Sequence, residues 1–597
     1  MTAEPRSRNT LLQAWIRALE KTAAVAERPT VTLPGRVDEL AEIYGDAPAL
    51  LGERETITYR GLAERSRRYA RWALANGVGP GTVIGLLMTN QPEYVAIWLG
   101  IVRVGGVAAL INTNLTGDVL SRSIALVSPK HVIVDTALEQ AATGGLVQLA
   151  PSITCWVHGP SRSDTALRID RDVEGFSAAP LDDAERATPS VSDLALHIYT
   201  SGTTGLPKAA NITHFRLLEW SCWFTAMMDA QAEDRLYNCL PLYHSTGGIT
   251  AIGAMLLAGG SVVLRQRFSA SRFWDDVIAN DCTIFQYIGE LCRYLLNASA
   301  QPSETGHRIR LCCGNGLQRG VWEPFQRRFR IPQILEFYAS TEGNVSLYNC
   351  EGKPGAIGRI PPFLAHRLPV ALIRCDDLGN PLRNEQGLCM PCGTDEVGEA
   401  LGRIGGAGEA RISQFDGYTD QTASERKVLH DVFAAGDAWF RTGDLMRKDA
   451  QGFFYFVDRL GDTFRWKGEN VATTEVAEVI AACPQVTEAV VYGVRIPGAE
   501  GRAGMAAITA GPAFELDELR RHLAARLAPY ARPLFVRVCQ ALKTTGTFKP
   551  IKTVLADEGF DPAGSGDPVF VEDRDRQAYV RLTPELHGEI LQGQFGF

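Results

Sequence analysis

The first two-thirds of the chain alternate amphipathic helical segments with short apolar strands. Residues 62–77, LAERSRRYARWALANG, and 93–105 repeat apolar positions at helical spacing, whereas residues 83–88, VIGLLM, and 131–135, HVIVD, are short apolar runs. The same rhythm returns in four later apolar segments, at 235–240, 262–264, 283–287 and 309–311. Repeated strand, turn and helix predict an α/β fold in which a parallel sheet carries helices on its faces.

The pattern changes after Gly398, where β-hairpins replace the strand–helix rhythm. Residues 449–452, DAQG, form a predicted turn between two aromatic-rich strands. Beyond Arg459 a new helix–strand–helix unit begins, with segments 473–484, 488–494 and 513–529. We therefore expect a large N-terminal domain at residues 1–459, built of stacked α/β subdomains and a β-rich subdomain, and a small α+β C-terminal domain at residues 460–597.

Three apolar stretches have to be weighed as membrane segments. Residues 94–111 are interrupted by Arg103, and residues 247–264, GGITAIGAMLLAGGSVVL, reach 18 uncharged residues only with five glycines among them. We interpret both as buried core, the second as a helix, a turn and a strand. Residues 11–24, LLQAWIRALEKTAA, alternate apolar and charged residues at helical spacing and predict an amphipathic helix, which can lie on a membrane surface.

Composition narrows the class of protein. A length of 597 residues exceeds a single core and requires at least two domains. The formal net charge of −8 argues against a nucleic-acid partner, because such a partner needs a basic face. The thirteen cysteines are scattered, and the close pair Cys389 and Cys392 has no second pair at matching spacing. We therefore expect reduced thiols in a cytoplasmic protein, and no zinc site.

One stretch, YTSGTTGLPK at residues 199–208, carries a strong chemical signal. Small and hydroxylated residues followed by a lysine can approach a polyanion closely, so we expect a phosphate site. The spacing does not fit the Walker pattern GxxxxGK[ST], and Ala209 stands at the hydroxyl position. A Rossmann fingerprint also fails, since Gly314, Gly316 and Gly320 are spaced GxGxxxG and are expected to lack a strand–helix context. The sequence contains no GxSxG elbow, the motif that would indicate a hydrolase.

Six segments together resemble the core motifs of the adenylate-forming superfamily of acyl-CoA synthetases, luciferases and peptide-synthetase adenylation domains. In order along residues 40–550 they are YTSGTTGLPK, LPLYHSTGG (240–248), EFYASTEGN (336–344), RTGD (441–444), DRLGDTFRWKGEN (458–470) and TGTFK (545–549). Three stretches, FRWKGEN, TIFQYIGELCRYL (283–295) and the tail EGFDP…AYVRL, look like the fatty acid transport protein and very-long-chain acyl-CoA synthetase branch.

The resemblance implies an ATP-dependent, Mg²⁺-requiring ligase that joins a long-chain or very-long-chain fatty acid to coenzyme A through an acyl-adenylate. A carboxylate is ionised near pH 7, so its attack on the α-phosphate needs positioning and charge neutralisation and no general base. By the resemblance, Thr341 hydrogen-bonds the α-phosphate and Glu342 holds Mg²⁺, a hard cation that suits a carboxylate. The phosphate loop then comprises Thr200, Ser201, Gly202, Thr203, Thr204, Gly205 and Lys208.

The same resemblance places the nucleoside. It implies that Asp444 accepts hydrogen bonds from both ribose hydroxyls, with Arg459 nearby. Lys549, on the C-terminal domain, would bridge the carboxylate and phosphate oxygens during adenylation. The residues that frame adenine are Gly314, Asn315, Gly316 and Tyr338, the glycines allowing close backbone approach and the tyrosine stacking.

The thiolation step implies rotation of the C-terminal domain. Gly461 stands where the superfamily usually has Asp or Lys, so the hinge is a permissive glycine and the pivot residue stays open. For the acyl chain, His244 either gates the carboxylate end or is a satisfied core histidine. Four glycines, Gly247, Gly248, Gly253 and Gly289, either open a tunnel between helix and sheet or pack closely. The residues implied for the thiolation face are Arg465, Trp466, Lys467 and Gly468.

Two other interpretations stay open. The chain can be a fatty acyl-adenylate-forming ligase that passes its product to a carrier protein, which would make the adenylate but little acyl-CoA. It can also be a lipid import protein in which activation is secondary and membrane contact is required. The amphipathic segment 11–24 would then attach it peripherally to the inner face of the cell membrane.

Overall fold

The structure, a computed structural model, describes residues 11–28, 30–147, 149, 153–185, 189–200, 207–376, 379–405, 414–467, 469–499, 501–545, 550–564 and 566–595. It divides into two compact units. Unit 1 consists of Met1–Leu317, Pro324–Lys353 and Gly405–Lys427, and unit 2 consists of Gln318–Glu323, Pro354–Ile404 and Val428–Phe597. Both sides of the expected boundary at 459 lie in unit 2, so that boundary stays a prediction.

A seven-stranded sheet of unit 1 positions the glycine-rich segment. Its order is β7-β6-β5-β3-β4-β8-β9, and its strands are β3 (Val83–Leu87), β4 (Val107–Leu110), β5 (His131–Asp135), β6 (Thr154–His158), β7 (Leu167–Arg168), β8 (Leu194–Thr200) and β9 (Lys208–Thr213). All neighbours pair in parallel except β8 and β9, which pair antiparallel. Apolar side chains of α5 (Gly117–Ala125) and α6 (Glu139–Val147) share a core with these strands.

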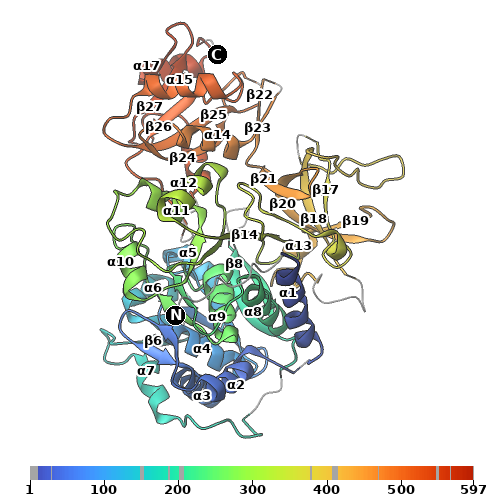
Figure 1. Cartoon of the computed structure of the whole chain (residues 1–597). Helices are drawn as coiled ribbons and strands as arrows, with labels where there is room; N and C mark the ends of the chain where they lie inside the picture. Colours follow the sequence, from blue (N-terminus) through green and yellow to red (C-terminus); the bar gives the residue numbers. More distant parts are fainter. Residues whose placement is uncertain are drawn as a thin grey trace. The chain divides into compact units, whose positions relative to one another are not determined.

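A second sheet of unit 1 runs in the order β15-β14-β13-β12-β10-β11-β1-β2. Its strands are β1 (Pro48–Leu51), β2 (Thr56–Thr58), β10 (Arg235–Asn238), β11 (Ser261–Leu264), β12 (Ile284–Ile288), β13 (Leu311–Asn315), β14 (Ile334–Ala339) and β15 (Ser346–Asn349). Pairing is parallel from β1 through β14 and antiparallel at the two edges. Figure 1 labels β14 of this sheet, with α8 (His214–Met227) and α9 (Ala251–Ala258) below it in the view.

The helices of unit 1 are capped and buried as their sequences require. Thr32, Thr58 and Thr213 accept backbone hydrogen bonds at the starts of α2, α3 and α8, which are typical N-caps. The bounds are α1 (Leu11–Ala26), α2 (Leu33–Tyr44), α3 (Tyr59–Ala75), α4 (Pro92–Arg103), α7 (Ile169–Asp172), α8 (His214–Met227), α9 (Ala251–Ala258), α10 (Phe273–Ala279), α11 (Gly289–Asn297), α12 (Arg319–Phe329) and α13 (Gln421–Glu425). Only α12 has residues in both units.

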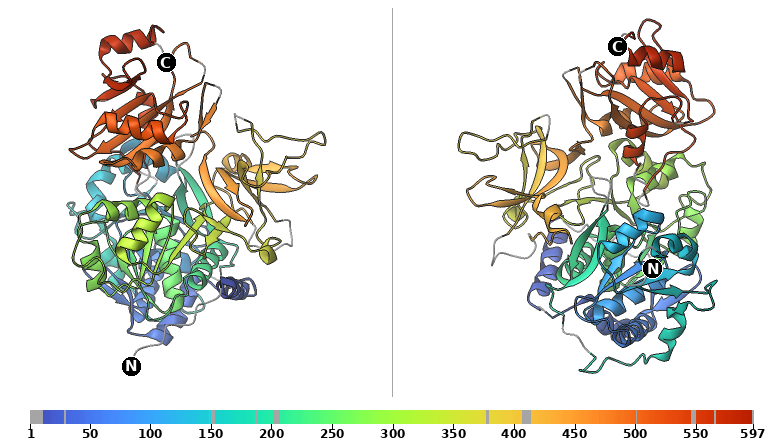
Figure 2. Two further views of the ribbon diagram at one scale, coloured as in Figure 1. Left: turned by 45° about the horizontal axis from the view of Figure 1, so that its top comes forward. Right: turned by 180° about the vertical axis from the view of Figure 1, so that it is seen from behind.

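The amphipathic helix α1 packs its apolar side against α8. Trp15 is 3% exposed and meets Trp223 of α8 edge to face, with ring centroids 6.0 Å apart. Arg17 donates from Nη2 to the Ala226 carbonyl of the same helix at 3.0 Å. Figure 2 shows α1, in dark blue, at the side of unit 1. The apolar face predicted to be able to meet a membrane is therefore covered by protein.

Unit 2 contains an antiparallel sheet in the order β17-β18-β20-β21-β16, with β19 beside β20, and a five-stranded sheet in the order β24 to β28. The strands are β16 (Gly358–Arg359), β17 (Val370–Ile373), β18 (Val397–Arg403), β19 (Val428–His430), β20 (Ala438–Lys448), β21 (Phe453–Arg459), β22 (Phe464–Trp466), β23 (Glu469–Val471), β24 (Val486–Val494), β25 (Ala503–Ala510), β26 (Phe535–Val538), β27 (Val569–Asp573) and β28 (Ala578–Arg581). The helices are α14 (Thr473–Ala481), α15 (Leu516–Arg526), α16 (Lys552–Glu558) and α17 (Pro584–Leu591).

The sequence predictions of element type are confirmed, and the α/β fold class with them. Residues 247–264 form the end of a π-helix at Thr246–Thr250, then α9, a left-handed Gly259 with φ of +79°, and β11. Two expectations are wrong. The strand expected at 309–311 begins only at Leu311, and Gly314, Gly316 and Gly320 do lie in a strand–turn–helix context, between β13 and the first turn of α12.

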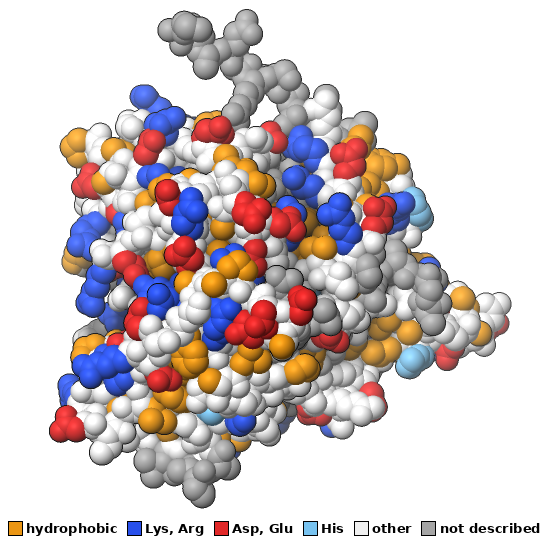
Figure 3. All heavy atoms as spheres, turned by 90° about the horizontal axis from the view of Figure 1, so that it is seen from below, with side chains coloured by type: hydrophobic (Ala, Val, Ile, Leu, Met, Phe, Trp, Pro, Cys, Tyr) orange, Lys and Arg blue, Asp and Glu red, His pale blue; other side chains and the backbone are white. Residues whose placement is uncertain are grey.

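The described residues include no helix that is both long enough and apolar enough to cross a membrane. The thirteen cysteines, all within those residues, are free thiols, as expected for Cys389 and Cys392. On the face drawn in Figure 3, basic, acidic and hydrophobic side chains of the described residues are interspersed.

Candidate functional site

The carboxyl ends of four parallel strands bring most of the implied residues of unit 1 to one sheet edge. The segment with His244 follows β10, and Gly289 follows β12 directly. Asn315 ends β13, and Thr341 and Glu342 follow β14 in the connection to β15. Because the carboxyl edge of an open parallel sheet is the usual place for ligands, this arrangement supports a nucleotide site.

The phosphate-loop segment joins the two strands of the β8–β9 hairpin. Thr200 and Lys208 are register partners at its open end. The residues between them that we expect at the phosphates, Ser201, Gly202, Thr203, Thr204 and Gly205, lie outside the described residues.

Lys208 and Glu342 meet at a tyrosine, Tyr418. The Lys208 Nζ lies 5.2 Å from the centroid of the Tyr418 ring, and Tyr418 Oη donates to Glu342 Oε1 at 2.7 Å. Tyr418 is 5% exposed, and burial together with Glu342 raises the pKa of its hydroxyl, so the group stays a donor at neutral pH. Thr341 Oγ1 lies 3.3 Å from Ser245 Oγ. The implied phosphate cation, the magnesium carboxylate and the α-phosphate contact are thus neighbours in one unit.

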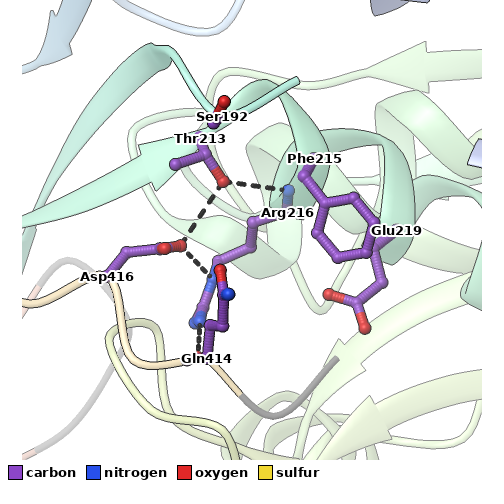
Figure 4. Close-up of a pocket in the computed structure, with 7 residues that line it drawn as sticks. All are labelled: Ser192, Thr213, Phe215, Arg216, Glu219, Gln414 and Asp416. Carbon is purple, nitrogen blue, oxygen red and sulfur yellow. Dashed lines mark hydrogen bonds and ion pairs between the residues drawn. The ribbon is translucent and has the colours of Figure 1, made fainter. Parts of the chain in front are cut away.

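A buried arginine on α8 holds the segments that carry these residues. Arg216 donates to the Gly343 carbonyl at 2.6 Å and to the Gln414 carbonyl at 2.8 Å, and pairs with the Asp416 carboxylate at 3.0 Å. Figure 4 shows Arg216 reaching between Asp416 and the Gln414 backbone in a small pocket. Breaking a buried ion pair such as Arg216–Asp416 costs about 3–5 kcal/mol, so Arg216 is firmly placed. Its hydrogen bond to the Gly343 carbonyl ties the Glu342 loop to it.

The same pocket contains a second carboxyl group, on Glu219. Burial raises the pKa of Glu219 to about 8, although Arg216 opposes the shift. No contact in Figure 4 joins Glu219 to the other residues drawn. This burial favours the neutral form of the Glu219 carboxyl group.

Glycines make the adenine segment possible. A Cβ on Gly314 would stand 2.2 Å from the Tyr287 carbonyl oxygen, and one on Gly289 would stand 1.9 Å from the Gly316 carbonyl oxygen. Gly316 has φ of +79°, a left-handed conformation that favours glycine. Asn315 presents a buried Oδ1 that has no hydrogen-bond partner among the described residues. The backbones of these two strand ends therefore touch, with a polar atom beside them.

A buried carboxyl group, Glu336, supports this turn from below. Glu336 accepts from the Leu317 amide at 3.0 Å and from the Tyr287 hydroxyl. Burial raises the pKa of Glu336 to about 8, against the effect of these donors. Glu336 lies on β14, two strands from the end of β12 that Gly289 follows. Its bond to the Leu317 amide fixes the turn that begins at Gly316. Tyr338, expected to stack on adenine, is half-buried on the same strand, β14.

The candidate acyl residues lie in closely packed surroundings. His244 is half-buried and its ring lies 4.6 Å from that of Tyr243. A Cβ on Gly248 would stand 1.9 Å from the Leu242 carbonyl oxygen, and one on Gly253 would stand 2.0 Å from Ser221 Oγ. Close approach of backbone and side chains accounts for these glycines, and the role of His244 stays a prediction.

Unit 2 brings the two implied ribose residues together. Asp444 of β20 and Arg459 of β21 are register partners, with Arg459 Nε 3.3 Å from Asp444 Oδ1. The preceding Arg441 is clamped by the fully buried Glu399, with Nη2 and Oε2 2.6 Å apart. Gly443, which lies between Arg441 and Asp444 in the chain, has φ of +77°. The RTGD segment is thus held by a buried ion pair, and the implied ribose carboxylate of Asp444 is itself buried, 7% exposed, on β20.

The expected hinge lies beside a second buried carboxylate of unit 2. Gly461 has φ of +92°, and a Cβ there would meet no atom within 4 Å, so glycine is required by conformation and not by space. Asp458 is 1% exposed and accepts from the hydroxyl and the backbone amide of Thr473 at the start of α14. Lys552 donates to Asp462 at 3.0 Å and to Thr473 Oγ1 at 2.7 Å.

The remaining implied residues are placed only in part. Arg465 is exposed on β22, and its carbonyl accepts from the Arg502 amide at 2.7 Å. Lys549 and Gly468 lie outside the described residues. Their implied roles stay predictions.

Sequence reasoning did not identify three residues that organise the site. Tyr418, Arg216 and Glu336 lie outside the six motif segments or inside one without a role of their own. The letters FDGYT at 415–419 carried no signal beyond their place in a polar stretch, where functional residues are often found. Arg216 and Glu336 gave none, since only the fold shows that they are buried.

Comparison with known proteins agrees with this geometry. Residues 37–386 match the AMP-binding enzyme family, and residues 475–549 match the AMP-binding enzyme C-terminal domain. The chain is 42% identical over 526 residues to long-chain fatty acid transport protein 1 of Mus musculus, covering 87% of this chain and 81% of that protein. It is 40% identical over 560 residues to the medium/long-chain-fatty-acid–CoA ligase FadD6 of Mycobacterium tuberculosis, covering 92% and 89%.

Solved structures show the same fold. The anthranilate CoA ligase AuaEII in complex with anthranoyl-AMP superposes with a TM-score of 0.76 at 20% identity, over 89% of this chain and 98% of that one. ATP-bound MatB from Rhodopseudomonas palustris superposes with a TM-score of 0.73 at 23% identity, over 88% and 99%. The chain belongs to the AMP-binding enzyme family, the adenylate-forming superfamily that its six motifs resemble.

Proposed function

We propose that the protein is an ATP-dependent, Mg²⁺-requiring long-chain fatty acid:CoA ligase that works through an acyl-adenylate. The observation that carries the proposal is the meeting of Lys208, Tyr418 and Glu342 beside Thr341, in a chain of the AMP-binding enzyme family. The fatty acid as substrate is supported by relatives named as long-chain fatty acid transport proteins and as a medium/long-chain fatty acid–CoA ligase.

In the first step a carboxylate oxygen attacks the α-phosphorus of ATP, and the bond from that phosphorus to the bridging oxygen breaks to release diphosphate. The acid is already ionised, so the protein has to hold the reactants in line and to balance negative charge. Lys208 and Lys549 supply cations, and Thr341 supplies a hydroxyl donor. Because Lys208 and Thr341 are held by described neighbours before the reaction, these two groups need little reorganisation at the transition state.

The residues present fit Mg²⁺. Mg²⁺ in nucleotide sites is held by one or two carboxylates together with substrate phosphates and water, and it does not need an all-protein cage. Glu342 offers one such carboxylate, half-exposed and with its other side fixed by Tyr418. No group of three acidic, histidine or cysteine side chains gathers elsewhere in the described part of the chain. When bound, the ion neutralises phosphate charge.

In the second step the thiol sulfur of coenzyme A attacks the acyl carbonyl carbon, AMP leaves with the carboxyl oxygen, and the thiol proton is released. We assign the thiolation face to Arg465, Trp466, Lys467 and Gly468 and the hinge to Gly461. A glycine with positive φ and free space around it can change its backbone angles at low cost, which supports this assignment.

The test is to supply ATP, Mg²⁺ and fatty acids graded by chain length, with and without coenzyme A, and to identify products by mass spectrometry. The proposal predicts acyl-CoA and AMP with an optimum among long chains. Acyl-adenylate that accumulates despite coenzyme A would instead favour transfer to a carrier protein. Acyl-CoA formed best from short or aromatic acids would contradict the substrate class.

We also propose that the protein works in the cytoplasm and touches the membrane peripherally, where long-chain acids partition. The names of the fatty acid transport relatives support this location. The face of α1 that packs on Trp223 is covered, so attachment through α1 would have to use its outward side, where Ile16 is 39% exposed. Ile16→Glu should then abolish flotation with vesicles, and deletion of residues 10–24 should do the same. Unchanged flotation of both variants would exclude attachment through α1.

A further inference from the structure

Tyr418 reaches the phosphate-loop strand through an added edge. Thr419 donates its amide to the Ala209 carbonyl at 3.0 Å, and the Asn211 amide donates to the Gly417 carbonyl at 3.0 Å. These bonds and an antiparallel bridge between Ala210 and Tyr418 lay residues 416–419 along β9. Residues two apart on a strand share a face, so Lys208 is the diagonal neighbour of Tyr418.

This register gives the tyrosine two opposite charges to hold at once. Its ring face receives the Lys208 ammonium at 5.2 Å, a cation–π contact, and its hydroxyl donates to the Glu342 carboxylate at 2.7 Å. No ion pair joins Lys208 to Glu342 in the part of the chain that the structure describes. Without the tyrosine between them, the Lys208 ammonium and the Glu342 carboxylate would attract each other and neutralise their charges.

The tyrosine is itself held rigidly. Its amide donates to Ser424 Oγ at 2.8 Å, and its ring belongs to a small core with Ala210 and Ala423. Arg216, through Asp416, fixes the start of the same segment, and through the Gly343 carbonyl it fixes the loop that carries Glu342. Both partners of the tyrosine–carboxylate bond are therefore tied to one buried guanidinium.

We propose that Tyr418 is a positioning residue that keeps Lys208 and Glu342 apart and presets each for Mg²⁺-bound nucleotide. This deepens the proposed function and rests on it. The ring directs the ammonium toward phosphate, and the hydroxyl leaves one carboxylate oxygen of Glu342 for the metal ion. Without the tyrosine the two charges would pair with each other, and nucleotide binding would have to break that pair.

Binding of ATP without fatty acid, measured by calorimetry at limiting and at saturating Mg²⁺, tests the proposal without turnover. Tyr418→Phe keeps the ring and loses the hold on Glu342, so ATP affinity should fall about tenfold at limiting Mg²⁺ and little at saturating Mg²⁺, the loss of one hydrogen bond to a charged group. Tyr418→Leu loses both contacts and should weaken binding at saturating Mg²⁺ as well. Tyr59→Phe, which removes a buried hydroxyl bonded to the Gly260 carbonyl at 2.7 Å, is the matched control and should bind as the parent does.

A double-mutant cycle with Glu342→Gln completes the test. If Tyr418 acts through Glu342, Tyr418→Phe should change the Mg²⁺ dependence less than about twofold once the carboxylate is gone. Two results would overturn the proposal, provided that thermal melting shows folded variants. One is an equal tenfold loss of ATP affinity on adding Tyr418→Phe to the Glu342→Gln variant. The other is no loss of affinity when Tyr418→Phe is made in the parent protein. Absence of ATP binding by the parent protein would contradict the proposed function itself.

Discussion

At the scale of single residues, the site is a set of charges fixed by neighbours that take no part in the chemistry. Lys208 and Glu342 are held by Tyr418, and Arg441 of the RTGD segment is held by the buried Glu399. Buried polar groups with satisfied partners are rigid, because leaving one unpaired is costly. A charge set in this way needs little rearrangement when a polyanion arrives.

Lys549 is expected to act in adenylation only. Lys549→Ala removes the cation that would bridge the carboxylate and phosphate oxygens, so formation of acyl-adenylate should fall by at least about a hundredfold, a loss typical of a transition-state charge contact. Conversion of supplied acyl-adenylate and coenzyme A to acyl-CoA should be nearly unchanged. Single-turnover assays of the two half-reactions make the comparison, with the neighbouring Lys543→Ala as control. Equal loss in both half-reactions would show a structural role.

Glu342 is expected to set the magnesium requirement. Glu342→Gln keeps the size of the side chain and the Tyr418 contact but removes the negative charge, so half-maximal activity should need roughly tenfold more Mg²⁺. A magnesium titration of acyl-CoA formation at fixed total ATP checks this. A titration that superposes on that of the parent would place the ligand elsewhere.

At the scale of elements, sequence patterning was a good guide where one element decides its own form. Periodicity identified the helix at 62–77 and the strand at 83–88, and it separated the segment 247–264 into helix, turn and strand. It placed a strand at 309–311, whereas β13 spans Leu311–Asn315. The apolar residues Ile309 and Leu311 gave no sign that the strand would continue through Gly314. The contacts of Tyr418 with Glu342 and Lys208 could not be predicted from the sequence either. They depend on how segments that are distant in the chain pack together.

The tight packing around Gly248 predicts a sharp effect of substitution on stability. In Gly248→Ala a Cβ would stand 1.9 Å from the Leu242 carbonyl oxygen, and backbone cannot give way as a side-chain end can. The free energy of unfolding should fall by more than about 3 kcal/mol, the upper range for overpacking. Gly144→Ala in α6, with no atom within 4 Å of the new Cβ, should be neutral or slightly stabilising. Urea unfolding of both variants makes the comparison, and equal stability would contradict the packing account.

At the scale of the whole molecule, stability should depend on pH through buried histidines of unit 1. Burial lowers the pKa of His214 to about 4, and neither ring nitrogen has a hydrogen-bond partner among the described residues. Below pH 6.5 the unfolded chain takes up a proton that folded His214 refuses until about pH 4, so stability is lost as pH falls through this window. The raised pKa values of Glu219 and Glu336 act in the opposite direction, between pH 8 and 4.5.

A substitution isolates the histidine from those carboxyl groups. His214→Phe keeps an aromatic ring of similar size, and the shifts of Glu219 and Glu336 are common to both proteins. The loss of unfolding free energy between pH 7 and pH 5 should be about 2 kcal/mol smaller in the variant, the value of 1.5 pKa units. Urea unfolding at the two pH values, followed by tryptophan fluorescence, measures the difference. Parallel losses would mean that His214 does not resist protonation.

The central claim is that the carboxylate of a fatty acid is joined to the α-phosphate of ATP before coenzyme A reacts. The most direct measurement is to supply a long-chain fatty acid labelled with ¹⁸O in its carboxylate, together with ATP, Mg²⁺ and coenzyme A, and to weigh the nucleotide product. An acyl-adenylate route yields AMP that carries one ¹⁸O, with none in diphosphate, because the acyl carbon leaves one carboxylate oxygen on phosphorus. ADP as product, or AMP free of label, would contradict an acyl-adenylate route.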